Sequence, residues 1–264
     1  MDEYIAFAKQ LANQAGNIMR EHFGLNIDTQ YKTDNTPLTI ADTSINQLVI
    51  DEVRKHFPEH GVLGEEASFN VDREYLWVVD PVDGTMSYSH GLPTSTFSLA
   101  LVQNGHTVVA AVEDPFTHRQ YYAVKGAGAF VNDQRLHVND QAELGPKTFI
   151  DLAAHFSLKS FDAVKVMATL ASKNVRATKS FTAICNTLPV AAGQHAASIV
   201  FLESPWDGAA VSLIVTEAGG KVTDLAGHER AWNQPGDGFV ASNGVMHDQL
   251  LEILHQSTLG STTV

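Results

Sequence analysis

The sequence predicts a mixed fold of helices and strands, and three observations lead to that prediction. Apolar residues recur at helical spacing from Tyr4 to Phe23. The pair Asn104-Gly105 separates two runs of strand-forming residues, as in a tight hairpin. After Gly145-Pro146, strand-like and helix-like segments alternate. Such alternation is typical of a partly parallel sheet that is covered by helices.

The elements of the first half follow from apolar periodicity and turn residues. The first helix ends at Gly24, because the helical spacing of apolar residues stops there. A second helix begins near Asp42 and ends before Pro58. Two short apolar runs, 62–64 and 77–79, are predicted as buried strands. Further strands of the same sheet are predicted at 96–103, 107–113, 121–124 and 129–131.

The second half has a different rhythm, which predicts a second lobe. Strands are predicted at 148–152, 175–178 and 197–202, with helices near 160–173 and 182–192. A last helical stretch precedes the pair Gly219-Gly220. We therefore expect a single domain over residues 1–264, with an N-terminal lobe of about 1–145 and a C-terminal lobe of about 146–264.

Composition favours a compact protein of the cytoplasm. The 264 residues are 44% hydrophobic, which is enough for a large core. No apolar run approaches the roughly 18 residues that a membrane-spanning helix needs. The start Met1-Asp2-Glu3 is acidic where a secretory signal is basic. The single cysteine, Cys185, cannot form an internal disulfide, which fits a reducing compartment.

The charge balance argues against a polyanionic partner. The chain has 17 Lys and Arg against 30 Asp and Glu, a net charge of -13. Nucleic-acid affinity rests on basic residues that neutralise phosphates, so we expect no nucleic-acid partner. A small phosphate ester can still bind an acidic protein if metal cations supply the positive charge.

The segment Asp80-Pro81-Val82-Asp83-Gly84-Thr85 is the most informative stretch of the chain. It follows the apolar run Trp77-Val78-Val79, and Pro81 is expected to end that strand. A rigid turn of this kind can present two carboxylates and a carbonyl to hard divalent cations. The other interpretation is a plain Asx turn without a metal, because Asp, Pro and Gly are common turn residues.

Two more acidic corners favour the metal interpretation. Upstream, Gly64-Glu65-Glu66 ends a probable strand. Downstream, Trp206-Asp207-Gly208 leads into the helical stretch, with Asp207 in its first turn. An isolated acid there could simply complement the helix dipole. Three acidic corners beside buried elements are better explained together, as parts of one site.

These segments, in this order, resemble the signatures of the inositol monophosphatase family of Mg²⁺-dependent phosphatases. The resemblance spans nearly the whole chain and implies an α+β fold, the layered α/β/α/β/α sandwich of the inositol monophosphatase and sugar phosphatase type. It also implies a homodimer and inhibition by Li⁺. The segments that carry it are Leu38-Thr39-Ile40-Ala41-Asp42, Gly64-Glu65-Glu66, Asp80-Pro81-Val82-Asp83-Gly84-Thr85, Lys125-Gly126-Ala127-Gly128-Ala129-Phe130-Val131-Asn132, Trp206-Asp207-Gly208-Ala209-Ala210 and Thr216-Glu217-Ala218-Gly219-Gly220.

The resemblance implies a ligand set for two Mg²⁺ ions. One ion takes Glu65, Asp80 and the carbonyl of Val82. The other takes Asp80, Asp83 and Asp207, so that Asp80 bridges the pair. A third, weaker ion near Glu65 belongs to the same pattern. Cations are needed because several carboxylates this close together repel one another strongly.

The resemblance also assigns catalytic roles, with water as the nucleophile. Asp42, Glu65 and Thr85 are the catalytic residues: Thr85 orients the water, and Asp42 accepts a hydrogen bond from the Thr85 hydroxyl. The amides of Gly84 and Thr85, at the start of a short helix, hold phosphate oxygens. The full substrate-binding set implied by the resemblance is Asp83, Gly84, Thr85, Phe181, Thr182, Ala183 and Asp207.

The substrate is a small phosphate ester, with inositol monophosphate as the leading interpretation. Phe181 stands where inositol phosphatases have Gly, and Val200 stands where they have a Glu, unless a shift brings Glu203 there. A missing polar partner weakens discrimination strongly. Histidinol phosphate, fructose 1,6-bisphosphate, nucleotide 3′-phosphates and sugar phosphates therefore remain alternatives. A second anionic group would find Lys179, Arg176 or Lys173, whose other interpretation is a solvated loop.

An interpretation from a different class is also open. The chain could be a catalytically silent metal-binding regulatory protein, because a fold alone does not establish an activity. Glu66 is either an outer partner of the metal site or a solvated surface acid. His90, just beyond the acidic turn, has no assigned role.

Overall fold

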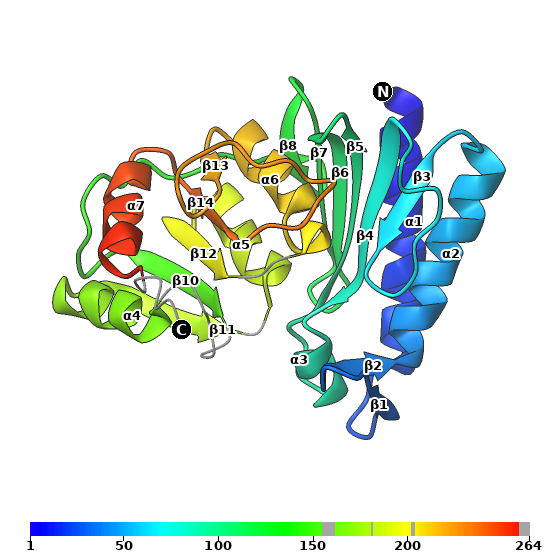
Figure 1. Ribbon diagram of the computed structural model, residues 1–264, viewed down its shortest axis with the longest axis horizontal. Coiled ribbons are helices and arrows are strands. Elements are labelled where there is room, and N and C mark those ends of the chain that lie inside the picture. The colour runs from blue at the N-terminus through cyan, green and yellow to red at the C-terminus, as the bar shows by residue number, and fades with distance from the viewer. Residues whose placement is uncertain (155–161, 181, 202–203, 259–264) are drawn as a thin grey trace, which may run out of the picture.

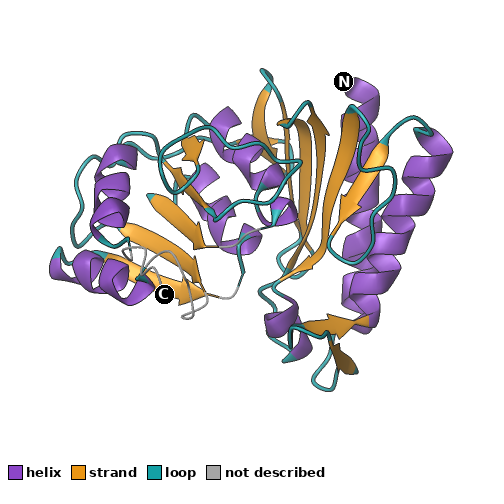
Figure 2. Cartoon of the chain, in the orientation of Figure 1, coloured by secondary structure: helices purple, strands orange, loops and turns teal. Residues whose placement is uncertain are grey.

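Helices and sheets alternate in layers across the molecule (Figures 1 and 2). The structure, a computed structural model, describes residues 1–154, 162–180, 182–201 and 204–258. From one side to the other the layers are α1 (Asp2–His22) with α2 (Ile40–His56), a seven-stranded sheet, α5 (Ile184–Ala191) with α6 (Ala209–Glu217), a five-stranded sheet, and α4 (Ala163–Ser172) with α7 (His247–Gln256). The α/β/α/β/α sandwich is confirmed. No helix within the described ranges has the length and apolar character needed to cross a membrane.

The seven-stranded sheet contains every strand predicted from the first half. Its strands, in spatial order, are β3 (Gly61–Gly64), β4 (Tyr75–Asp83), β5 (Thr96–Gln103), β6 (His106–Asp114), β7 (Arg119–Val124), β8 (Gly128–Val131) and β9 (Gln134–Arg135). All neighbours are antiparallel except β3 and β4. Asn104 and Gly105 both have positive φ, which is the backbone that a two-residue hairpin turn requires.

The five-stranded sheet is partly parallel, as the second half of the sequence predicts. Its spatial order is β11 (Arg176–Ser180), β10 (Phe149–Ala154), β12 (Ala197–Phe201), β14 (Phe239–Ser242) and β13 (Lys221–Thr223). β10 runs parallel to both β11 and β12. The antiparallel strands β13 and β14, and helix α7, were not predicted. The lobe boundary near residue 145 remains a prediction.

A small projection stands at one end of the seven-stranded sheet (Figure 1). It consists of the hairpin β1 (Thr29–Tyr31) and β2 (Pro37–Thr39), with the one-turn helix α3 (Thr85–Ser89) beside it. The hairpin was not predicted, because three-residue strands give no usable periodicity. It brings residues 32–37 next to the acidic turn.

Strand β4 does not end at Pro81, so the predicted strand boundary was wrong. The strand continues to Asp83, with a break in the pairing register between Asp80 and Asp83. Pro81 cannot donate to a ladder, but at an irregularity of this kind it does not need to. The break leaves both aspartates at the end of one rigid, buried strand.

A buried carboxyl group lies between the seven-stranded sheet and α1. Glu113 on β6 is 5% exposed and accepts a hydrogen bond of 3.2 Å from Gln120 Nε2. Gly16 of α1 permits this approach, since a Cβ there would lie 2.7 Å from Glu113 Cγ. Burial raises the pKa of Glu113 to about 7. Its carboxylate is therefore costly above that pH.

Replacing Glu113 by Gln is expected to stabilise the protein at pH 8 and to change little at pH 5. The folded pKa of about 7 lies above the ordinary value of 4.5, so the stability that Glu113 contributes is present below pH 4.5 and is lost as the pH rises through 7. A gain on the order of 1–2 kcal/mol in the free energy of unfolding is expected at pH 8. Urea unfolding at both pH values measures it.

The exposed Glu59 provides the matched control, and Glu59→Gln should change stability equally little at both pH values. Equal stability of Glu113→Gln and the unsubstituted protein at pH 8 would show that the buried carboxylate carries no cost.

Candidate active site

The end of β4 places two carboxylates in one cavity. Asp80 is 2% exposed, and its Oδ1 accepts a hydrogen bond of 3.1 Å from the Val82 amide. Gly84 follows Asp83 in the left-handed conformation, with φ 78°, and is the N-cap residue directly before α3. A Cβ on Gly84 would also lie 2.3 Å from Thr182 Cγ2. Only glycine meets both conditions, so the turn is fixed by the backbone.

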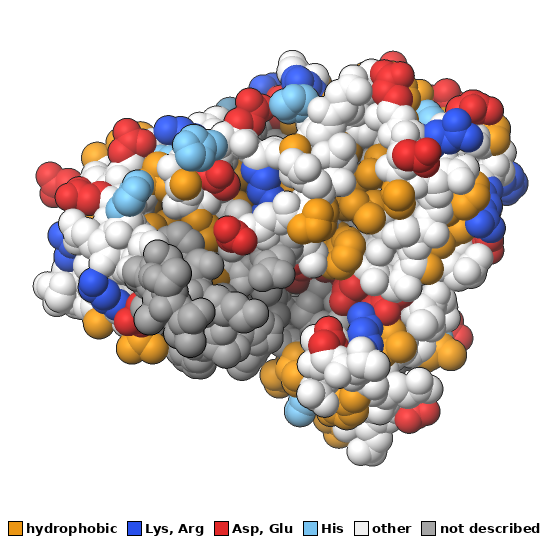
Figure 3. All heavy atoms as spheres, in the orientation of Figure 1, with side chains coloured by type: hydrophobic (Ala, Val, Ile, Leu, Met, Phe, Trp, Pro, Cys, Tyr) orange, Lys and Arg blue, Asp and Glu red, His pale blue; other side chains and the backbone are white. Residues whose placement is uncertain are grey.

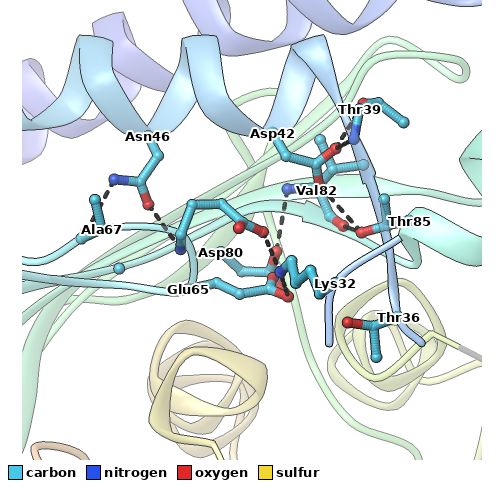
Figure 4. A network of polar contacts seen from close by, with 12 residues as sticks. Lys32, Thr36, Thr39, Asp42, Asn46, Glu65, Ala67, Asp80, Val82 and Thr85 are labelled. Carbon is cyan, nitrogen blue, oxygen red and sulfur yellow. Dashed lines mark hydrogen bonds and ion pairs between the residues drawn. The ribbon is translucent and has the colours of Figure 1, made fainter. Parts of the chain in front are cut away.

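The hydroxyl of Thr85 joins α3 to α2. Asp42 is fully buried in the first turn of α2, where its Oδ2 accepts a 2.8 Å hydrogen bond from the Thr39 amide in a capping box. Its Oδ1 lies 3.1 Å from Thr85 Oγ1, as the resemblance implied. Thr85 Oγ1 is also 2.9 Å from the Val82 carbonyl, so its single proton has two acceptors within reach (Figure 4).

A lysine that the sequence analysis did not single out lies on the glutamate pair. Lys32, in the β1–β2 hairpin, donates to Glu65 Oε1 at 3.0 Å and to Glu66 Oε1 at 2.5 Å (Figure 4). The backbone amide of Glu66 donates to Asn46 Oδ1 at 3.3 Å. Glu66 is thus a partner within the acidic site and not a solvated acid. The tertiary fold brings Lys32 to the two glutamates. The residues around it in the sequence form no motif that would have predicted this contact.

Asp83 accepts hydrogen bonds from the start of α5, across the junction between the two sheets. The amides of Ala183, Ile184 and Cys185 donate to its carboxylate at 2.9, 3.1 and 3.0 Å. Thr96 Oγ1 lies 3.4 Å away on the neighbouring strand. Burial raises the pKa of Asp83 to about 6, and the three amides oppose that rise. One side chain thus joins the seven-stranded sheet to the central helical layer.

Asp207 reaches the same cavity from the segment between β12 and α6. It ends the short 3-10 helix η1 (Pro205–Asp207), and α6 begins at Ala209. The prediction that Asp207 lies in the first turn of the long helix was therefore slightly wrong, because Gly208 separates the two helices. Burial, followed by repulsion from Glu65 and Asp83, raises the pKa of Asp207 well above its ordinary value.

The acids line one cavity of about 430 Å³. In Figure 3 acidic side chains with a basic one among them lie in a recess beside the projection of α3 and the hairpin. Burial is the largest cause of the raised pKa of Asp80, and repulsion from the other acids raises that pKa further. Burial raises the pKa of Glu65 to about 7, against the attraction of Lys32. The cavity lining is Asp34, Asn35, Thr36, Pro37, Glu65, Asp80, Val82, Asp83, Gly84, Thr85, Met86 and Asp207.

The donor set fits hard cations. All of these ligand candidates are oxygens, which Mg²⁺ prefers over nitrogen or sulfur. Burial and mutual repulsion raise the pKa values of these acids, and Lys32 is the only basic residue hydrogen-bonded to them among the described residues, so added positive charge would stabilise their ionised forms. As they stand, no three Asp, Glu, His or Cys side chains of the described ranges are grouped closely enough to hold one ion. Cation binding would therefore have to draw the carboxylates inward.

Some of the residues considered for substrate contact lie at the cavity, and others do not. Thr182 and Ala183 lie against the acidic turn, through Gly84 and Asp83 respectively. Val200 is fully buried in the apolar core between the sheets, so it cannot replace a polar substrate contact. Phe181 and Glu203 lie outside the described residues. His90 is exposed on α3's end, with its ring nitrogen 2.8 Å from the Met86 carbonyl.

Cys185 contacts Asp83 through its backbone amide, while its thiol and Lys179 are not among the residues that line the cavity. Burial raises the pKa of the Cys185 thiol to about 12, which agrees with an unreactive core cysteine. Lys179 is on β11, where burial lowers its pKa and the neighbouring Asp151 opposes that effect.

Fold and site together define a class of protein: a layered sandwich with an acidic cavity where the two sheets meet. A family model described as the inositol monophosphatase family matches residues 1–259. The chain belongs to the inositol monophosphatase family.

Curated relatives are similar along most of their length. A fructose-1,6-bisphosphatase/inositol-1-monophosphatase of Thermotoga maritima is 31% identical over 256 residues, 95% of each chain. A Nus factor SuhB of Xylella fastidiosa is 31% identical over 227 residues, 82% of this chain and 80% of the relative. A histidinol-phosphatase of Chlorobaculum parvum is 30% identical over 257 residues, 94% and 95%. The family and these names point to phosphatase activity without fixing a substrate.

Solved structures agree with the fold. An inositol monophosphatase of Thermotoga maritima has a TM-score of 0.87 at 31% identity, covering 97% of this chain and 98% of that one. A protein described as an inositol monophosphatase/NADP phosphatase, complexed with Mg²⁺ and phosphate, has a TM-score of 0.82 at 25% identity, covering 98% and 97%.

The metal-free protein is expected to be more stable at pH 5.5 than at pH 8. The folded pKa values of Glu65 and Asp83, about 7 and 6, lie above the ordinary 4.5 and 3.8, so their contribution is lost as the pH rises through 6 and 7. Mg²⁺ at about 100 times its dissociation constant should restore about 2.7 kcal/mol at pH 8. Thermal unfolding in EDTA and in Mg²⁺ measures both effects, with KCl at equal ionic strength as control. A Mg²⁺ effect at pH 8 no larger than that of KCl would contradict the interpretation.

Proposed function

We propose that this protein is a Mg²⁺-dependent phosphomonoesterase that hydrolyses a small phosphorylated metabolite, with inositol monophosphate as the leading substrate. The observation that carries the proposal is the convergence of carboxylates from separate segments on one cavity, with pKa values raised by burial and by each other. Such a site needs cations, and an anionic ester is the ligand that loaded cations attract.

Mg²⁺ would be held by Glu65, Asp80, the Val82 carbonyl, Asp83 and Asp207. When bound, it supplies positive charge that lowers the pKa of the attacking water and stabilises the departing ester oxygen. Water then adds to phosphorus while the bond to the alcohol oxygen breaks, and the products are phosphate and the free alcohol. We propose two ions, with a third near Glu65 as the resemblance implies.

The protein's own groups orient the reactants. Thr85 Oγ1 lies within hydrogen-bond distance of Asp42 Oδ1 and the Val82 carbonyl, so its proton is directed to one of them and its lone pairs stay available to accept from a water. Burial raises the pKa of Asp42, and the hydrogen bonds from Thr39 oppose that rise. The amides of Gly84 and Thr85 would hold phosphate oxygens. Because α3 has five residues, these amides act as individual donors, with little help from a helix dipole.

The identity of the ester is the finer part of the proposal. Val200 offers no hydrogen-bonding side chain in place of the expected Glu, so we propose that hydroxyl recognition comes from the backbone and hydroxyls near Thr182 and Ala183, or from Glu203 if a shift brings it there. Relatives named for histidinol phosphate and for fructose bisphosphate support those esters as alternatives. The predicted homodimer, cytoplasmic location and lack of a nucleic-acid partner remain part of the proposal.

Asp83→Asn is expected to lower Mg²⁺-dependent phosphate release by about a hundredfold or more, because the substitution removes a proposed ligand's charge. Asn keeps one oxygen for the α5 amides but turns an NH₂ donor toward the rest, so the thermal midpoint in EDTA is measured as well to separate lost activity from lost stability. Asp140→Asn, at an exposed position, is the matched control and should keep full activity. Full activity in the Asp83 variant would refute its role.

Phosphate release from a panel of esters distinguishes the substrate classes from one another. It also distinguishes an enzyme from a catalytically silent metal-binding protein. With Mg²⁺, we expect turnover of inositol 1-phosphate to exceed that of histidinol phosphate, fructose 1,6-bisphosphate and a nucleotide 3′-phosphate, and millimolar Li⁺ to inhibit it. A different ester at the top of the ranking would reassign the substrate and keep the phosphatase. Mg²⁺ binding by calorimetry without turnover of any ester would instead support a regulatory protein.

A further inference from the structure

The connection between β13 and β14 is tied to the turn that carries Asp207. Arg230 Nη1 donates to the Gly238 carbonyl at 3.0 Å, which closes the connection on itself. Nη2 of the same guanidinium lies 3.5 Å from the carbonyl of Ser204. Ser204 immediately precedes η1, so Arg230 contacts the N-terminal side of the Asp207 turn.

A tryptophan from the same connection holds the other side of that turn. The Trp232 ring packs on Gly208 so closely that a Cβ there would lie 2.2 Å from ring atom Cζ3. The Trp232 backbone amide donates to the Gly105 carbonyl at 2.8 Å, in the β5–β6 turn. Its ring meets Phe239 edge-on at 5.7 Å. Trp232 is therefore fixed by contacts on several sides. Asp207 lies in the chain between Ser204, which Arg230 contacts, and Gly208, which Trp232 contacts.

Arg230 connects these two contacts. Its guanidinium carbon lies 4.6 Å from the Trp232 ring centroid, a stacking distance. A planar guanidinium that is stacked on one face and hydrogen-bonded at its edge has little freedom to turn. Burial raises the pKa of Asp207, and the charge of Arg230 partly opposes that rise. Arg230 thus contacts the backbone and the ring on either side of Asp207, and its positive charge also counters the raised pKa of Asp207.

We propose that Arg230 is a positioning residue for the metal site, which holds the turn of Asp207 between its own contact with Ser204 and the Trp232 contact with Gly208. The inference rests on the proposed function, in which Asp207 binds Mg²⁺. Residues that contact a metal-ligating side chain orient it toward the metal, and their loss typically weakens metal binding by about 10- to 100-fold. Neither the acidic motifs nor their spacing points to residue 230.

Two effects of removing Arg230 oppose each other, which makes the test decisive. If the guanidinium acted only through its charge, its removal would strengthen Mg²⁺ binding, because a nearby positive charge repels a cation. If it acts by positioning, its removal weakens binding. The sign of the change in affinity therefore separates the two roles.

The experiment measures the Mg²⁺ dissociation constant by calorimetry at pH 7.5 without an ester, together with the thermal midpoint in EDTA. Arg230→Met keeps the apolar stem and should bind Mg²⁺ about tenfold more weakly. Arg230→Lys keeps the charge and should recover only part of the affinity, and it serves as the test if the Met variant does not fold. Arg135→Met is the matched control, since Arg135 also lies over an aromatic ring, that of Phe130, but on the exposed β9.

An unchanged or lower dissociation constant in Arg230→Met would overturn the positioning role while leaving the proposed function intact. A fall in thermal midpoint alone, with unchanged affinity in both variants, would also overturn it. Failure of the unsubstituted protein to bind Mg²⁺ would refute the proposed function itself, and the positioning role with it.

Discussion

Mutual repulsion among buried carboxylates is the constraint on which the site depends. Glu65, Asp80, Asp83 and Asp207 line one cavity, and burial raises the pKa of each. A fold that gathers such groups must offset part of the cost with donors or cations. The donors in this protein differ from acid to acid, and those of Glu65 and Asp83 connect the cavity to other structural elements, the β1–β2 hairpin and the start of α5.

The compensating groups explain the architecture around the cavity. Asp83 takes three amides from the start of α5, and Glu65 takes Lys32 from the hairpin. The turn of Asp207 is held by the connection that contains Arg230. Asp80 accepts only a neighbouring backbone amide among the described hydrogen bonds. In the proposed ligand set Asp80 is also the acid that contacts both cations. The acid whose charge receives little stabilisation from protein groups is therefore the one that the cations would stabilise most.

The same contacts link cation binding to the junction between the sheets. Asp83 ends β4 of the seven-stranded sheet, while its amide partners begin the helix that separates the two sheets. A cation that drew the Asp83 carboxylate inward would pull on that helix as well. Lys32 bonds to Glu65, the glutamate that the proposed ions would use, so a bound cation and the lysine would compete for its Oε1.

The elements of the fold were largely readable from the sequence. Helical spacing in residues 4–23, the Asn104-Gly105 turn and the strand-helix alternation after residue 146 are local signals, and local signals survive without knowledge of the fold. The three-residue strands of the hairpin and β13 were missed because three residues carry too little periodicity, and the four-residue β14 was missed as well. The continuation of β4 through Pro81 was missed because a register break relieves the lost hydrogen bond, and that break depends on the neighbouring strand.

The sequence by itself singled out the acids Glu65, Asp80, Asp83 and Asp207 and the turn Gly84-Thr85 that line the cavity, since those motifs are short and contiguous. Only the tertiary structure decided what surrounds them. Lys32 and Arg230 stand in stretches without a motif. Lys32 reaches the carboxylates of Glu65 and Glu66, and Arg230 reaches the carbonyl of Ser204 beside the Asp207 turn, because chain segments far apart in sequence pack together. Charge compensation acts through space, so no pattern along the chain could reveal it.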